Sequence, residues 1–211
     1  MTSGTHRPNR TNPISGRGRA TRYRIIDQAA RLWAASGNAE PSVAEIAQAA
    51  GVFPNQITHH FCSKDALLVH AAFLQLLHDA KRFEPVGETA RDAAAFRRNI
   101  ARVVYAAPSL PMVARALAAG ITTPDLGPVI DTHLRILFHQ SEHFLRRLAK
   151  GRDWDLDRPL GSEVRTFWSA ALGASLLYSA GVGGASSDLD LAGVLTIHGR
   201  PRFSGQREGA G

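Results

Sequence analysis

The sequence has little that would form a disulfide, cross a membrane or build a sheet. Cys62 is the only cysteine among 211 residues, so the chain forms no internal disulfide and a reducing compartment is expected. No stretch approaches the roughly 18 apolar residues that span a bilayer, and the N-terminus lacks the apolar segment of a secretory signal. We therefore expect a soluble cytoplasmic protein.

Motifs for catalysis and cofactor binding are missing as well. The glycine-rich stretch SAGVGGASS lacks the spacing G-x-G-x-x-G and follows no expected strand. The segment HQSEH, residues 139–143, is not the H-E-x-x-H of a metalloprotease, and no nucleophile elbow is present. We expect no cofactor and no enzymatic activity.

Positive charge is concentrated at the N-terminus. The formal net charge is +7, and residues 1–24 contain six arginines and no acidic residue. An arginine-rich arm beside a folded domain is typical of a protein that binds a polyanion. A tail that only improves solubility is the alternative. Because residues 1–20 contain few apolar side chains, we expect them to be disordered.

The remainder of the chain has the pattern of an all-α protein. Alanine and leucine are abundant, and apolar residues recur at three- and four-residue spacing. Thr21, Ser42 and Ser63 are suitable N-caps, and no alternating pattern indicates a strand. The expected helices cover residues 21–36, 43–50, 54–60, 63–83, 90–107, 111–120, 126–151, 161–181 and 187–199.

Residues 43–60 predict a helix-turn-helix. Ser42 and Glu45 have the spacing of a capping box, Gly51 permits a left-handed turn, and Pro54 suits the first position of the next helix. In this geometry the second helix enters the major groove of DNA. Many other helical proteins contain similar corners, so the motif alone is only moderately specific.

With its flanks, the segment from residue 21 to 73 resembles the N-terminal domain of the TetR/AcrR family of repressors. The matching features are the opening RIIDQAA, the Gly37 stop, AGV at 50–52, HHF at 59–61 and SKDALL at 63–68. The rest of the chain is similar to the family only in its helical architecture. The resemblance implies a homodimeric, ligand-responsive transcription factor, a repressor of a palindromic operator, with residues 54–60 as its recognition helix.

The expected domain organisation follows from this resemblance. It comprises a disordered arginine-rich tail at 1–20, a helix-turn-helix DNA-binding domain at 21–68 with a linking helix to about 83, a helical ligand-binding and dimerisation domain at 84–200, and a disordered tail at 201–211.

DNA contacts are expected on and around the recognition helix. Asparagine and glutamine amides suit adenine, and a lysine at a helix N-terminus suits phosphate. The predicted DNA-binding residues are Arg22, Arg24, Ser42, Pro54, Asn55, Gln56, Thr58, His59 and Lys64. Two residues depart from the family pattern, because Phe53 replaces a small polar residue and Thr58 replaces an aromatic one. Residues 21–65 carry four basic and four acidic side chains, so binding should depend on the arginine tail.

The C-terminal domain is expected to bind a small, apolar effector and to form the dimer. Large apolar residues on different helices, with one histidine, are predicted to line the ligand site: Phe96, Tyr105, Met112, Phe138, His139 and Trp168. Small residues in the segment 161–181 allow close helix contact, and with the segment 190–199 this region resembles the two-helix dimer surface of the family. The resemblance implies these dimer residues: Phe167, Ala170, Gly173, Ala174, Leu177 and Val194. Ordinary core packing remains the alternative for both sets.

Three further hypotheses compete with this interpretation. His133, His139 and His143 have helical spacing that can hold zinc or a similar ion, which would make the protein a metal-responsive regulator. Cys62 follows the recognition helix and could respond to oxidation. A helical enzyme or ligand-binding module without DNA activity is the third, although it would need clustered catalytic groups.

Overall fold

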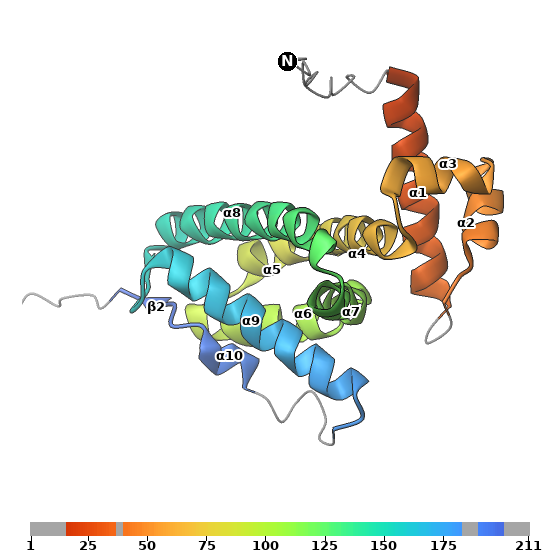
Figure 1. Cartoon of the computed structure of the whole chain (residues 1–211). Coiled ribbons are helices and arrows are strands. Elements are labelled where there is room, and N and C mark those ends of the chain that lie inside the picture. Colours follow the sequence, from red (N-terminus) through yellow and green to blue (C-terminus); the bar gives the residue numbers. More distant parts are fainter. Residues whose placement is uncertain (1–15, 37–39, 183–189, 201–211) are drawn as a thin grey trace, which may run out of the picture.

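The computed structural model describes residues 16–36, 40–182 and 190–200 (Figure 1). The helices are α1 (Gly16–Ala35), α2 (Val43–Ala50), α3 (Pro54–Phe61), α4 (Lys64–Ala80), α5 (Phe83–Thr89), α6 (Ala93–Tyr105), α7 (Ser109–Thr122), α8 (Gly127–Arg152), α9 (Leu160–Ser179) and α10 (Leu191–Val194). A 3-10 turn, η1 (Pro124–Leu126), precedes α8. Two short strands, β1 (Trp154–Asp155) and β2 (His198–Gly199), pair antiparallel. The fold is all-α, as predicted.

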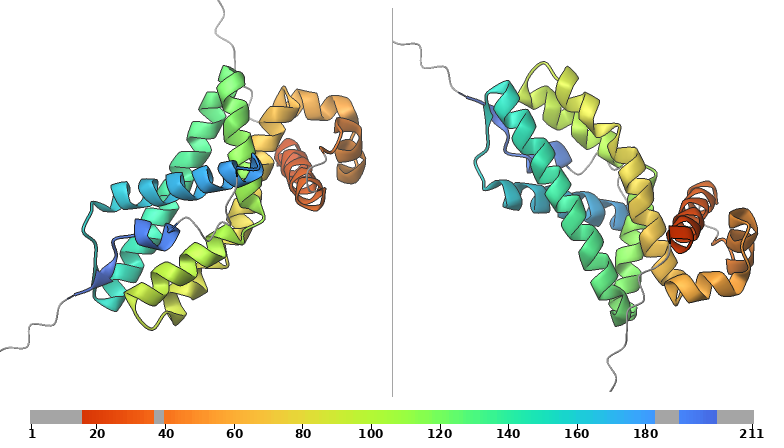
Figure 2. Two further views of the ribbon diagram at one scale, coloured as in Figure 1. Left: turned by 90° about the horizontal axis from the view of Figure 1, so that it is seen from below. Right: turned by 90° about the horizontal axis from the view of Figure 1, so that it is seen from above.

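The molecule has two lobes, here called the head (α1–α3) and the body (α5–α10). Both views in Figure 2 show the head at one end of the molecule, joined to the body through α4. Helix α4 packs against α1 on the head side and against α7 and α8 on the body side. The same helix therefore contacts both lobes along its length.

The turn between α2 and α3 forms as the sequence predicts. The Ser42 hydroxyl accepts a hydrogen bond from the Glu45 amide (3.1 Å), and the Glu45 carboxylate accepts one from the Ser42 amide (2.7 Å). The second bond lowers the pKa of Glu45 because it favours the charged carboxylate. Gly51 lies in the left-handed region at φ 60°, where a side chain would be strained. Buried Ile46 and Ile57 then hold α2 and α3 against the core.

Helix α1 begins earlier than the sequence predicts. It begins at Gly16, so Thr21 lies inside the helix and is not its N-cap, and residues 16–20 are helical instead of disordered. No proline occurs between residues 14 and 40, and arginine and alanine are good helix formers, so nothing local stops the helix. Residues 1–15, and the expected Gly37 stop, lie outside the described residues.

The expected linking helix is divided in two. Helix α4 ends at Ala80, and the separate helix α5 begins at Phe83. Gly87 does not stop a helix; it lies buried inside α5. A Cβ atom at Gly87 would lie 3.0 to 3.1 Å from the side chains of Leu148 and Phe144 of α8, so a larger residue would push these side chains aside where α5 approaches α8.

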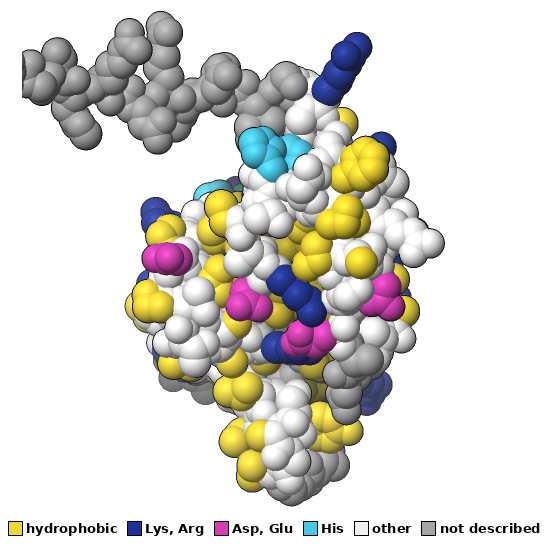
Figure 3. All heavy atoms as spheres, turned by 45° about the vertical axis from the view of Figure 1, so that its right-hand side comes forward, with side chains coloured by type: hydrophobic (Ala, Val, Ile, Leu, Met, Phe, Trp, Pro, Cys, Tyr) yellow, Lys and Arg dark blue, Asp and Glu magenta, His cyan; other side chains and the backbone are white. Residues whose placement is uncertain are grey.

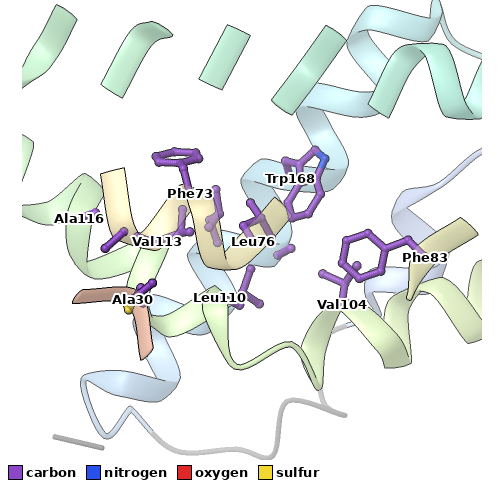
Figure 4. Packing of buried hydrophobic residues seen from close by; sticks show 14 of the residues in the cluster. Ala30, Phe73, Leu76, Phe83, Val104, Leu110, Val113, Ala116 and Trp168 are labelled. Atoms are coloured by element: carbon purple, nitrogen blue, oxygen red, sulfur yellow. The ribbon is translucent and has the colours of Figure 1, made fainter. Parts of the chain in front are cut away.

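The core of the body is built around α4, α7 and α9. Figure 4 shows Phe73 and Leu76 of α4 among Val113 of α7 and Trp168 of α9. The buried carboxylate of Asp79, at the end of α4, accepts a hydrogen bond from the Ser109 amide (3.1 Å) and so caps α7. Packing and capping together fix α4 to the body.

The C-terminal segment differs most from the prediction. The helix expected at 187–199 is only α10, capped by Asp190, and an extended segment to β2 follows. Leu195 and Ile197 are buried on one side of this segment, which is a strand-like alternation. Thr196 donates to the fully buried carboxylate of Glu163 on α9. The predicted caps at 187 and 188 and the tail at 201–211 lie outside the described residues.

Within the described residues, no single helix is long and apolar enough to cross a membrane. Helices α6 and α7 pass that test of length and composition only as a pair, with a bend of 67° between them.

Candidate functional site: a nucleic-acid interface and an internal cavity

Helix α3 presents one polar face to solvent. Ile57 and Phe61 are buried against the rest of the head. The predicted DNA-binding residues Asn55, Thr58 and His59 are exposed on the opposite side, together with Pro54. The structure thus brings four predicted residues onto one surface, on a helix whose buried side fixes its orientation. Such a face has the shape and the hydrogen-bonding groups to read base edges.

Gln56 and Ser42 carry out local structural tasks as well. The side-chain oxygen of Gln56 accepts a hydrogen bond from the Phe53 amide (3.0 Å), which is the half of a capping box that does not need the N-cap side chain. The amide nitrogen of Gln56 remains a donor. Ser42 is exposed, and its hydroxyl already caps α2, so its proton is the group left for a phosphate.

Phe53 is a candidate contact residue that sequence reasoning recognised only as a departure from the family pattern. It lies directly before α3, and the residue is 77% exposed to solvent. An apolar side chain at this position can contact the methyl group of thymine. The signal in the sequence was a phenylalanine in a polar turn.

Lys64 lies at the first position of α4, where an ammonium group and a helix N-terminus can both bind phosphate. Its Nζ atom lies 2.9 Å from Oε2 of Glu40, which precedes α2. Arg115 of α7 pairs with the other oxygen of Glu40. The predicted phosphate contact therefore has a carboxylate partner, and this carboxylate also links the head to the body.

Arg22, predicted to contact DNA, is half-buried and engaged within the protein. Its side chain turns inward, donates to the backbone carbonyl of His60, and lies 2.6 Å from Nε2 of His70. The guanidinium also covers the ring of Phe61 at 4.3 Å. Burial lowers the pKa of Arg22. Arg24 is exposed on the same helix, so it remains the arginine of this pair that is available to DNA.

Charge on the outer surface of the head is mixed. In Figure 3, basic and acidic side chains are interspersed on the visible face, with hydrophobic side chains between them. Exposed Arg17, Arg19 and Arg24 lie along α1. The positive charge that could approach DNA is therefore arranged on a helix, at least from Gly16 onward.

A small cavity of about 60 Å³, partly open to solvent, lies in the body. Its wall is almost entirely apolar, with one hydroxyl, from Ser141, whose oxygen accepts a hydrogen bond from Trp168 Nε1 (2.9 Å). The lining residues are Phe83, Phe96, Ile100, Val104, Ser141, Phe144, Leu145, Val164, Phe167, Trp168 and Leu195. The cavity is smaller than the 300 Å³ or more of an ordinary ligand pocket.

Only part of the predicted ligand set lines this cavity. Phe96 and Trp168 do. Met112 is buried but outside the cavity wall, Tyr105 and Phe138 are half-buried elsewhere, and His139 is exposed on α8. Ser141 and the smaller apolar residues were missed, because their meeting depends on how four helices pack and leaves no local pattern.

A second hollow, of about 490 Å³, opens beside β1 and β2 at the start of α6. Four arginines line it: Arg91, Arg97, Arg152 and Arg200. Arg91 and Arg200 are paired with Asp92 and Asp153 at 3.1 Å, and Arg152 donates to backbone carbonyls of the segment 87–90. Arg97 donates to the Leu195 carbonyl (3.2 Å). Arg152 therefore ties the end of α8 to α5, and Arg97 and Arg200 tie the C-terminal segment to α6 and to the turn after α8.

The predicted dimer residues divide between surface and core. Gly173 and Leu177 are exposed on α9, and Ala170 and Val194 are half-buried. Ala174 is buried, and Phe167 lies in the cavity wall, where it cannot meet a second copy. Other large apolar side chains are exposed along α8, α9 and the segment after it: Ile136, Leu176, Tyr178 and Val182.

The three histidines of α8 do not gather into one site. His133 faces α4, whereas His139 and His143 are exposed. Among the described residues, no group of three histidine, cysteine or acidic side chains could hold a metal ion. Cys62 is exposed at a positive φ of 64° just after α3. The metal-responsive alternative is therefore not favoured by the geometry.

Comparison with known proteins gives a consistent result for both lobes. Residues 25–71 match the family model described as bacterial regulatory proteins, tetR family. Residues 93–196 match the model described as bacterial transcriptional repressor C-terminal. Comparison with curated proteins gave no match.

Solved structures share the fold. A candidate transcriptional regulator from Rhodococcus sp. RHA1 is 28% identical, with a TM-score of 0.67, over 82% of this chain and 93% of that one. A candidate TetR-family regulator from Rhodococcus sp. is 16% identical, with a TM-score of 0.59, over 82% and 95%. FadR of Thermus thermophilus, a TetR-family repressor solved with lauroyl-CoA, is 20% identical, with a TM-score of 0.54, over 82% and 88%.

Proposed function

The chain belongs to the TetR family of bacterial transcriptional regulators, and from this premise we propose that it is a repressor that binds a palindromic operator as a homodimer and responds to a small apolar effector. The observation that carries the proposal is the two-sided character of α3. Asn55, Thr58 and His59 are exposed on one side of the helix, and the other side is buried against the head. An enzyme without DNA activity is not favoured. As a regulator of chromosomal genes, the protein would work in the cytoplasm.

In the proposed complex, α3 of each protomer enters a major groove. Asn55 and Gln56 donate to and accept from base edges, and Phe53 contacts a thymine methyl group. Lys64, Ser42 and Arg24 contact phosphates and set the register of the head on the duplex. Two heads on successive major grooves would lie about 34 Å apart, which requires a dimer.

The dimer is proposed to form through α8 and α9. Leu176, Leu177 and Tyr178 are consecutive exposed residues in the last turn of α9, and exposed Gly173, one turn before Leu177, allows a close approach there. Ile136 adds an exposed apolar side chain on α8. Large exposed apolar side chains that follow one helix are typical of a protein interface. Two copies of α8 and α9 would bury them together.

The effector is proposed to occupy the cavity between α6, α8 and α9. Its apolar wall with one hydroxyl suits a mainly hydrocarbon ligand with few polar groups. Because the cavity measures only about 60 Å³, such a ligand must move the surrounding helices to enter. Its binding would then favour a conformation of the body different from the present one.

The proposal is tested by fluorescence anisotropy with DNA from the region upstream of the gene, across a salt series. We expect tight, sequence-selective binding that weakens steeply with salt, and a loss of selectivity in Asn55→Ala. His143→Asn, an exposed change on α8, is the matched control. Equal, weak binding of any DNA would reject a sequence-specific regulator and leave only non-specific attraction.

A further inference from the structure

A line of side chains connects the end of α3 to the body. Arg22 of α1 donates to the carbonyl of His60, at the end of α3, and approaches Nε2 of His70 on α4 at 2.6 Å. Nδ1 of His70 lies 2.9 Å from Nε2 of His133 on α8. Four helices thus meet in one chain of polar contacts. The sequence predicts that Arg22 contacts DNA and that His133 is a possible metal ligand, but it does not predict the contacts between them.

The direction of each hydrogen bond in this line follows from Arg22. A guanidinium can only donate, so Nε2 of His70 must accept. A neutral His70 then carries its proton on Nδ1 and donates it to Nε2 of His133. His133 in turn must carry its own proton on Nδ1. One arrangement of protons therefore satisfies the whole line, from the guanidinium to α8.

The surroundings hold these side chains in place. Phe73 stacks on His133 with ring centroids 4.8 Å apart and an angle of 6° between the planes. The ring of Phe61 contacts both the Arg22 guanidinium and the His70 ring. His70 and His133 are both half-buried. A partly buried hydrogen-bonded line of this kind tolerates few alternative arrangements, because an unmet donor or acceptor costs free energy.

Helix α8 also forms part of the cavity wall. Ser141, Phe144 and Leu145 line the cavity on the helix that carries His133. His133 and Ser141 are eight residues apart, or about 12 Å along the axis. A displacement of α8 by an occupant of the cavity would therefore reach His133 directly.

We propose that His70 and His133 are the positioning residues that couple the cavity to the recognition helix. While α8 keeps its present place, His133 holds His70, His70 holds Arg22, and Arg22 holds the end of α3. When α8 moves, the line breaks at His133 and α3 loses this restraint. The inference rests on the proposed function for its biological meaning, but the mechanical coupling itself requires neither DNA nor an identified ligand.

Hydrogen exchange in the free, full-length protein tests the coupling. In His133→Phe the ring can still stack on Phe73, but the acceptor for His70 is lost. We expect amides at the end of α3, close to His60, to exchange about fivefold faster, which corresponds to the loss of about 1 kcal/mol from one hydrogen bond. His139→Phe, the same substitution at an exposed position of α8, should leave α3 unchanged. Equal exchange of α3 in both variants would overturn the proposal.

Rescue separates coupling from general damage to the body. His133→Gln restores a hydrogen-bond acceptor, and we expect it to return the exchange of α3 toward the wild-type rate. If glutamine and phenylalanine give the same fast exchange, the polar line does not carry the effect and the proposal fails.

A spectroscopic measurement on the wild-type protein tests the proposal even if the variants do not fold. Nitrogen-15 shifts of the imidazoles should show both His70 and His133 protonated on Nδ1. A proton on Nε2 of His70 would show that His70 does not accept a hydrogen bond from Arg22, and the proposal would fail. If His133→Phe speeds the exchange of α3 but the wild-type protein binds no operator candidate, the proposed function is wrong and the inferred coupling still holds.

Discussion

The Lys64 ammonium lies 2.9 Å from the Glu40 carboxylate, so the predicted phosphate contact is already paired with an acid. Both side chains are partly exposed, and an exposed pair contributes only about 0–1 kcal/mol to stability. The effect on DNA binding can be larger, because a phosphate must compete with Glu40 for Lys64. We therefore expect Glu40→Gln to bind operator DNA about three- to tenfold more tightly. Anisotropy titration measures this.

Glu88→Gln provides the control for that change. It removes the same charge from an exposed position in the body, and its DNA affinity should equal that of the wild type. If Glu40→Gln also matches the wild type, the pair with Lys64 does not limit DNA binding.

Asn55 and Lys64 should differ in what they contribute to recognition. Asn55→Ala removes an amide from the exposed face of α3, so discrimination against an altered base pair should fall by about 1–3 kcal/mol. Lys64→Ala removes a phosphate contact, so binding to all sequences should weaken together and the slope of log K against log salt should decrease by about 0.9. Salt titrations on operator and mutated duplexes distinguish the two. The assignment is wrong if the two variants show the same pattern.

Stability should fall in mild acid through His70. Burial, followed by the charges of Arg22 and His133, lowers the pKa of His70 from 6.5 to about 4. Between these values the unfolded chain binds more protons than the folded protein, so the free energy of unfolding decreases as the pH falls from 6.5 toward 4. Above pH 6.5 this contribution is fully present. Allowing for the partial exposure of His70, we expect a loss of about 1–2 kcal/mol.

Urea denaturation at pH 7.0 and 5.0 measures this dependence. The nearby titratable groups are Arg22, His60, His133 and Cys62, and His60 and His133 also have lowered pKa values because of burial. His70→Gln should lose a clear part of the pH dependence, whereas His139→Gln, at an exposed position, should retain all of it. Parallel curves for all three proteins would contradict the role given to His70.

Asp79 should contribute to the stability of the body through its hydrogen bond to the start of α7. Its carboxylate is buried and accepts from the Ser109 amide at the start of α7. In Asp79→Ala that buried amide loses its partner, which should cost about 1–3 kcal/mol of unfolding free energy. Asp125→Ala, at an exposed site in η1, should change stability by less than about 0.5 kcal/mol. Urea midpoints compare the two variants, and a similar small change in both would refute the assignment.

The parts of the fold that depend on neighbouring residues were predictable from the sequence. Ser42 with Glu45 forms the capping box, Gly51 makes the left-handed turn, and Ser63 caps α4 through the Ala66 amide. Each depends on contacts between residues a few positions apart, which one sequence reveals directly. The exposed face of α3 follows from the same local pattern.

The rest depends on contacts between distant segments. In the sequence, Arg22 cannot be distinguished from the other arginines near the N-terminus. The structure shows that it contacts His60 and His70, which are distant in sequence. The extended segment after α10 looks helical until Thr196 is seen to bind Glu163. Helical periodicity identifies the buried side of a helix but not the partner it meets, so the cavity and the line from Arg22 to His133 could not be predicted.

Because α8 is 26 residues long, a small rotation of the helix becomes a larger displacement far from the point about which it turns. A tilt of about 5° about Ser141 would carry His133, about 12 Å away along the axis, through about 1 Å. A hydrogen bond of 2.9 Å stretched by that amount is no longer a hydrogen bond. The hydrogen bond between His70 and His133 therefore depends on the tilt of α8. It is kept while the tilt changes by much less than about 5° and is broken by a tilt of that size.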